Sequence, residues 1–148
     1  MGDRKKLGVL IASHGPFSKG ALESAQMIVG PVSQERVRAV GLPPDGDILQ
    51  FKEEFSKELE ALQAENEEIL ILTDIVGGTP NNTALEYALI DDSIQVISGF
   101  NLVLVINILF NLDQTFNVTE ILDESKNALV DVLSIVKQNK AEEDDLCL

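Results

Sequence analysis

The chain contains one histidine, His14, which stands where an apolar run ends in a glycine turn. The run covers residues 7–12, and Gly15 follows the histidine. Imidazole changes charge near neutral pH, and its neutral ring nitrogen can attack carbon or phosphorus. Open α/β sheets bind ligands in the crevice beyond the carboxyl ends of their strands. His14 is therefore the first candidate for a reactive group; the alternative is that it packs or caps locally.

A second candidate, Asp74, ends the most apolar strand-length run of the sequence, residues 68–74. If this strand lies parallel to the one before His14, both residues reach the same edge of the sheet. A carboxylate there can accept one ring N–H, which fixes the tautomer and stabilises positive charge on the ring. The pair predicts a histidine nucleophile with Asp74 as its orienting acid. The alternative for Asp74 is a simple turn residue.

Two glycine-containing turns favour phosphoryl transfer over alkylation or acylation of the ring. Residues 15–17 and 78–81 stand where helices are expected to begin. The first amides of a helix carry partial positive charge and can hold an anion. Gly15, Gly78 and Thr79 are therefore candidate phosphate-binding residues. Thr79 can equally cap its helix, with the following proline at the first helical position.

Other kinds of site are disfavoured by the sequence. There is no Walker-type loop, dinucleotide fingerprint or zinc-ligand cluster, and the chain has one cysteine, Cys147. We therefore expect no metal and no cofactor. A serine hydrolase would need Ser13 and His14 to converge, but neighbours on a strand point to opposite faces. A receiver-type module would need acidic metal ligands after the first strand, where Ser13 and His14 stand instead.

Composition indicates one globular domain. The chain has 148 residues, 45% of them hydrophobic and 24% charged, which is ordinary for a single soluble domain. A net charge of −14 opposes nucleic-acid binding, which needs clustered lysine and arginine. No apolar run suits a membrane span or a secretory signal. We expect a cytoplasmic protein with no direct membrane insertion.

The elements that must position these residues follow a βα pattern. Apolar runs of strand length alternate with amphipathic helical stretches, which is typical of a parallel sheet with helices on both faces. Strands are expected over residues 7–12, 37–42, 68–74 and 94–98. Helices are expected over residues 18–29, 81–89 and 102–112, and from 117 onward. A further long helix is expected after Asp47, which caps its start, and Asn101 caps the 102–112 helix. The helix after Asp47 carries an apolar stripe of Leu49, Phe51, Phe55, Leu59 and Leu62.

The C-terminal part is expected to behave differently. Residues 129–136 are rich in β-branched side chains. They either continue the last helix or leave it as an extra antiparallel edge strand, and the β-branched residues favour the strand. We assign residues 1–136 to the domain and 137–148 to an acidic, flexible tail. The 102–112 helix is apolar nearly all round and needs a cover, which a subunit contact would supply.

Three motifs in this sequence carry a family resemblance. They are Ser13-His14-Gly15 with Gly20, Ala25, Met27 and Gly30 behind it, then residues 74–84, then Ser98-Gly-Phe-Asn101-Leu102. Together they resemble the Enzyme IIA component of the mannose family of the bacterial phosphoenolpyruvate-dependent sugar phosphotransferase system (PTS). The resemblance extends over residues 7–136.

This resemblance implies a function and an assembly. His14 would accept a phosphoryl group from the phosphocarrier HPr on Nε2 and pass it to a IIB component, making the chain a phosphotransferase. IIB would phosphorylate sugar entering through a IIC/IID permease. Asp74 would bond Nδ1 of His14, and Thr79 and nearby amides would line the phosphate site. The sheet would have four parallel strands in the order 2-1-3-4, in a homodimer that exchanges the C-terminal strand.

Two features depart from the family's pattern, and two alternatives stay open. Val103 and Leu104 stand where proline and methionine are common, and the residue before Asn82 is not aromatic. The alternatives are a phosphorylation-dependent regulatory module of the same fold and the phosphocarrier subunit of dihydroxyacetone kinase, which shares the histidine turn. The residue 77–80 turn favours the sugar system. The lack of a DNA-binding or ATPase segment favours a carrier. The transported sugar is not indicated.

Overall fold

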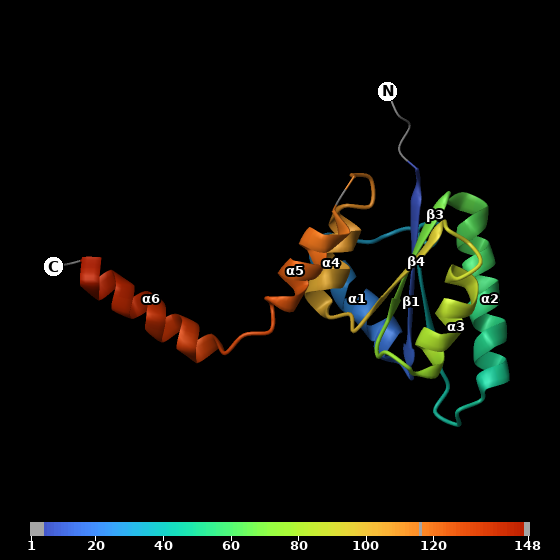
Figure 1. Cartoon of the computed structure of the whole chain (residues 1–148), viewed down its shortest axis with the longest axis horizontal. Helices are drawn as coiled ribbons and strands as arrows, with labels where there is room; N and C mark the ends of the chain where they lie inside the picture. Colours follow the sequence, from blue (N-terminus) through green and yellow to red (C-terminus); the bar gives the residue numbers. More distant parts are fainter. Residues whose placement is uncertain (1–4, 116, 147–148) are drawn as a thin grey trace.

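The computed structural model describes residues 5–115 and 117–146, so Cys147 lies outside the described residues. One sheet is built from β1 (Leu7–His14), β2 (Val37–Leu42), β3 (Glu68–Thr73) and β4 (Ile94–Ser98). Its strand order is β2-β1-β3-β4 and all neighbouring pairs are parallel (Figure 1). The predicted order 2-1-3-4 is therefore confirmed.

Helices cover both faces of the sheet, as predicted (Figure 1). The helices on one side are α1 (Phe17–Val29) and α4 (Leu102–Phe110), with α5 (Val118–Lys126) packed against α4. The helices on the other side are α2 (Ile48–Glu65) and α3 (Thr79–Ala88). Side chains of a strand alternate between the two faces. Val9 and Ile11 of β1 accordingly join the α1/α4 core, whereas Leu10 and Ala12 join the α2/α3 core.

Two of the helix caps predicted from the sequence, at Asp47 and Asn101, are present. Asp47 accepts a hydrogen bond from the Gln50 backbone N–H at 3.0 Å, and Asn101 accepts one from Leu104 at 2.9 Å. The α2 stripe is buried at Phe51, Phe55, Leu59 and Leu62. Leu49 was predicted to join it but is 70% exposed. Because residues two apart lie on opposite sides of a helix, Leu49 and Phe51 cannot both face the sheet.

The apolar helix α4 is covered within the chain on one side only. Its buried residues, Leu104, Val105, Ile108 and Leu109, pack in the core shared with α1 and α5. Phe110 stays 58% exposed. No helix among residues 5–115 and 117–146 is both long and apolar enough to cross a membrane.

The predicted C-terminal edge strand is absent from the described residues of this single chain. Residues 132–136 instead begin α6 (Val132–Leu146), which also includes most of the segment predicted to be a flexible tail. Asp131 accepts hydrogen bonds from the Ser134 N–H and hydroxyl at its start. A strand without a neighbour leaves its backbone groups unpaired, whereas a helix bonds them internally. α6 extends away from the sheet (Figure 1). Strand exchange with a second subunit stays a prediction.

Candidate active site at the carboxyl edge of the sheet

The parallel register of β1 and β3 brings His14 and Asp74 together. Ala12 lies opposite Thr73 in that register. Asp74 follows Thr73 directly and His14 is two residues beyond Ala12, so both lie at the same edge of the sheet. Nδ1 of His14 lies 2.8 Å from Oδ2 of Asp74. The backbone N–H of His14 donates to the same oxygen at 2.9 Å. One carboxylate therefore holds both the ring and the main chain of the histidine.

The surroundings of Asp74 keep it ionised. Its side chain is 12% exposed, against 50% for His14. Burial raises the pKa of Asp74, but the hydrogen bonds from the His14 backbone and ring, with the ring's charge, outweigh it and leave the pKa below its ordinary value. An ionised carboxylate only accepts hydrogen bonds, so Nδ1 carries the hydrogen. In the neutral ring, Nε2 then has a free lone pair and can act as a nucleophile.

Gly78 allows the backbone to approach the ring. A Cβ atom built there would lie 2.7 Å from Cε1 and 3.4 Å from Nε2 of His14. Gly78 directly precedes α3, and the first amides of a helix have no partner within it. Nε2 of His14 thus lies beside a helix N-terminus, which favours an anion.

The Thr79 side chain does not cap its helix, and the Gly15 amide is already hydrogen-bonded. Thr79 is the first residue of α3, and no side chain caps that helix, so the predicted Thr79 cap is not formed. The Gly15 N–H already donates to the Leu42 carbonyl at 2.8 Å. Gly15 has φ of +53°, a left-handed conformation that favours glycine. It therefore shapes the turn after His14, and its amide is not free to bind a phosphate.

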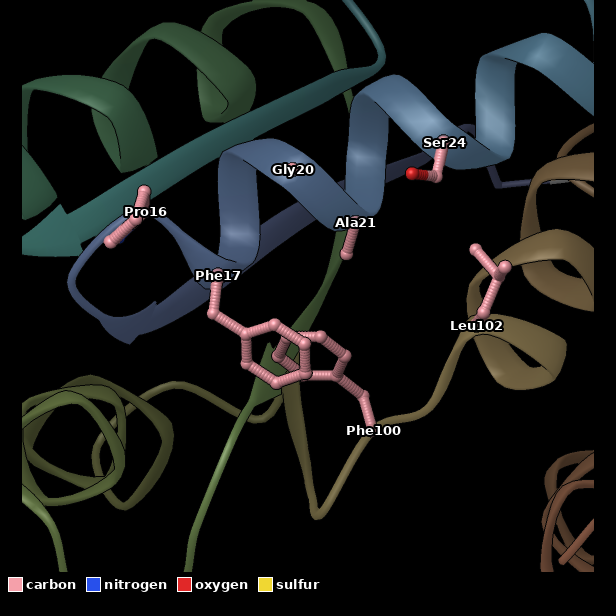
Figure 2. Close-up of a pocket in the computed structure, with 7 residues that line it drawn as sticks. All are labelled: Pro16, Phe17, Gly20, Ala21, Ser24, Phe100 and Leu102. Atoms are coloured by element: carbon pink, nitrogen blue, oxygen red, sulfur yellow. The ribbon is translucent and has the colours of Figure 1, made fainter.

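The residues that line an apolar groove beside the histidine turn were not identified from the sequence. The groove has a volume of about 480 Å³ and is lined by Pro16, Phe17, Gly20, Ala21, Ser24, Phe100 and Leu102 (Figure 2). The rings of Phe17 and Phe100 stack with centroids 4.9 Å apart. Phe17 is nevertheless 52% exposed. The sequence signal for this groove is weak: a phenylalanine follows the end of β1 (Phe17) and another follows the end of β4 (Phe100).

Ser13 does not form a hydrolase site with His14. Its side chain is fully buried, and its Oγ accepts a hydrogen bond from the Ser18 backbone N–H at 2.7 Å. His14 projects to the opposite face, beside Gly78. Among the described residues there is also no group of three or more His, Cys, Asp or Glu side chains able to hold a metal.

Fold and site together define a class: a parallel α/β protein whose one histidine has ring Nδ1 held by a carboxylate and its ring beside a helix N-terminus. Comparison with known proteins gives the family. The family model described as "PTS system fructose IIA component" (EIIA-man) matches residues 8–126. The chain belongs to this family, whose members are phosphotransferase components of sugar uptake and act with phosphocarrier and IIB partners.

Individual relatives agree with this family. The fructose-specific EIIA component of Bacillus subtilis is 31% identical over 70% of this chain and 68% of its own length. The mannose-specific EIIAB component of Escherichia coli is 26% identical over 72% of this chain, which spans only 32% of that protein. The crystal structure of the PTS IIA protein associated with the fucose utilization operon of Streptococcus pneumoniae has a TM-score of 0.85. It is 38% identical, and the match covers 89% of this chain and 97% of that one.

Proposed function

We propose that this chain is a histidine phosphocarrier in which Nε2 of His14 accepts a phosphoryl group from phospho-HPr and passes it to a IIB component. The observation that carries the proposal is the 2.8 Å contact between Nδ1 and Asp74. It assigns the hydrogen to Nδ1 and leaves Nε2, on a half-exposed ring, as the reactive atom. The sugar and the IIC/IID permease are involved only indirectly, through IIB.

The transfer itself needs only groups of this site and a docked partner. As the bond between Nε2 and phosphorus forms, the bond between phosphorus and the donor breaks, and the donor keeps that electron pair. The ring gains positive charge, which the Asp74 carboxylate stabilises through Nδ1–H. The phosphoryl oxygens lie toward the first amides of α3, at Gly78 and Thr79. Transfer to IIB follows the same steps in reverse.

The groove between α1 and α4 is the docking surface that we assign to both partners. It begins two residues after His14, and Phe17 forms one wall with its ring half exposed (Figure 2). A partner side chain placed there would bury apolar surface close to the ring. A carrier must release each partner, so a small contact of this kind suits it.

The experiment compares labelling of the wild type with that of His14→Gln. Phospho-HPr labelled with ³²P should transfer label to the wild type, and His14→Gln should fold normally but take none. Retained label on His14→Gln would exclude His14 as the acceptor. A regulatory module would accept label without supporting transport, so sugar uptake with matching IIB and permease components separates it from a carrier.

A further inference from the structure

We propose that Ser13 is a positioning residue for His14; this inference rests on the phosphocarrier function and extends it to a second side chain. Ser13 is fully buried and faces α1, on the opposite side of β1 from the imidazole. Its hydroxyl cannot reach the transferred group. Its contacts are instead with the main chain on either side of the histidine turn.

The Ser13 hydroxyl takes part in hydrogen bonds as acceptor and as donor. Oγ accepts the backbone N–H of Ser18 at 2.7 Å, and its O–H donates to the His14 carbonyl at 3.1 Å, with Gly15 O further away at 3.5 Å. The residue at the N-cap of α1 is Pro16, which makes no side-chain cap bond. Ser13 therefore supplies the cap oxygen that the helix start lacks.

Together with Asp74, Ser13 holds His14 at both of its main-chain polar groups. Asp74 accepts the His14 N–H, and Ser13 donates to the His14 carbonyl. With the main chain held, the ring can turn only about its side-chain bonds, and its Nδ1 contact with Asp74 restricts that too. Three contacts, at the N–H, the carbonyl and Nδ1 of His14, thus hold Nε2 toward the N-terminus of α3.

Removal of the Ser13 hydroxyl would release more than one bond. The Ser18 N–H is buried and would lose its acceptor, so the first turn of α1 is expected to shift toward another one. The turn that joins it to His14 would move as well. A small displacement of the ring lowers the rate of phosphoryl transfer within the complex more than it lowers the affinity for the partner.

The experiment uses Ser13→Ala, with Ser125→Ala as its matched control. Ser125 is also buried and donates its hydroxyl to a backbone carbonyl, that of Ile121 at 2.7 Å, but it lies on α5. For Ser13→Ala we expect kcat for transfer from phospho-HPr to fall about tenfold with KM within about twofold of wild type. Ser125→Ala should keep both constants near wild type. Equal kcat in both variants would overturn the proposal.

Conservative replacements separate the hydroxyl from general stability. Ser13→Thr retains Oγ and should restore most of the rate, whereas Ser13→Cys keeps the size with a weaker hydrogen-bonding group and should be intermediate. If Ser13→Thr were as slow as Ser13→Ala, the hydroxyl would not be the cause and the inference would fail. These variants also serve if Ser13→Ala does not fold.

A second measurement needs no phosphoryl donor. Because the chain has one histidine, ¹⁵N-histidine labelling gives a single pair of ring nitrogen signals. At a pH where the ring is neutral, the wild type should show the hydrogen on Nδ1, and Ser13→Ala should show a mixture of both tautomers. An unchanged spectrum in Ser13→Ala would contradict positioning, even if the wild type accepted no phosphoryl group and the proposed function failed.

Discussion

Oδ2 of Asp74 accepts two hydrogen bonds from His14, one from ring Nδ1 at 2.8 Å and one from the backbone N–H at 2.9 Å. The backbone bond persists whichever way the ring turns, so β1 and β3 remain joined at this edge independently of the imidazole. The ring bond adds an orientation to that fixed main chain. Asp74 therefore has a structural and an orienting contribution, which mutation can separate.

Replacement of Asp74 by asparagine should slow phosphoryl transfer. The amide oxygen can still accept a hydrogen bond, but it carries no charge to stabilise the imidazolium. A hydrogen bond to a charged group contributes about 1.5–3 kcal/mol, which corresponds to a loss of about tenfold to a hundredfold in rate. The loss is measured as the single-turnover rate of transfer from phospho-HPr to Asp74→Asn, relative to wild type.

Asp91→Asn is the control for this substitution. Asp91 also accepts hydrogen bonds from a nearby serine, and its pKa is lowered by them, but it lies in the turn before β4. Its loss should leave transfer unchanged. An Asp74→Asn rate equal to that of Asp91→Asn would reduce Asp74 to a structural role.

The contribution of Asp74 to stability should depend on pH. The pKa of this carboxyl is lowered in the folded state, whereas an unfolded aspartate titrates near pH 3.9. The ionised form thus stabilises the fold above about pH 4, and that stability is lost as pH falls through the lowered folded pKa. The free energy of unfolding of wild type should exceed that of Asp74→Asn at pH 7. Urea unfolding at several pH values should show the difference shrinking in acid; a constant difference would contradict the assignment.

A side chain at Gly78 should displace the ring. The added Cβ of Gly78→Ala would lie 2.7 Å from Cε1 of His14, closer than real contacts allow, so either the ring or the α3 start must move. We expect about a hundredfold slower transfer. The ring ¹⁵N signals should also shift, while thermal unfolding shows that the fold persists. Wild-type transfer in this variant would mean that the ring does not react in the position described.

The convergence of His14 and Asp74 could be predicted because it depends on one regularity. Parallel strands end at the same edge, and both residues stand two positions after the end of a buried apolar run. Whether the Gly15 N–H is free could not be predicted from such a regularity. Its N–H is bonded to Leu42 at the end of β2, and no local pattern reveals a partner from another strand. The groove residues could not be identified for the same reason, since Phe17 and Phe100 come into contact only once the chain has folded.

The state of residues 129–136 shows where local propensity is insufficient. Their β-branched side chains favour a strand, but a strand forms only beside another strand. In this chain the described sheet ends at β2 and β4, and residues 132–136 are helical. A prediction from composition has no means of knowing whether a neighbour is available.

Phe17→Ala should weaken docking without changing the chemistry of the ring. The substitution removes one wall of the groove and the stack on Phe100. Loss of a contact worth more than about 1 kcal/mol should raise KM for phospho-HPr about fivefold or more. Phe110→Ala, which removes a comparably exposed ring at the end of α4, is the control and should leave KM unchanged. The groove is not the docking surface if the two variants have the same KM.

The exposed apolar residues around the start of α6 should report on the proposed homodimer. Leu129 is 92% exposed and Leu133 is 62% exposed, so aspartate at both positions should cost the single chain little stability. In a dimer that covers this segment, the same charges would be buried at a high cost. Sedimentation should therefore show a dimer for wild type and a monomer for Leu129→Asp/Leu133→Asp. Lys137→Asp and Lys140→Asp change charged positions further along the same helix and should leave the dimer intact. A double leucine variant that still sediments as a dimer would place the subunit contact elsewhere on the molecule, such as the exposed side of α4.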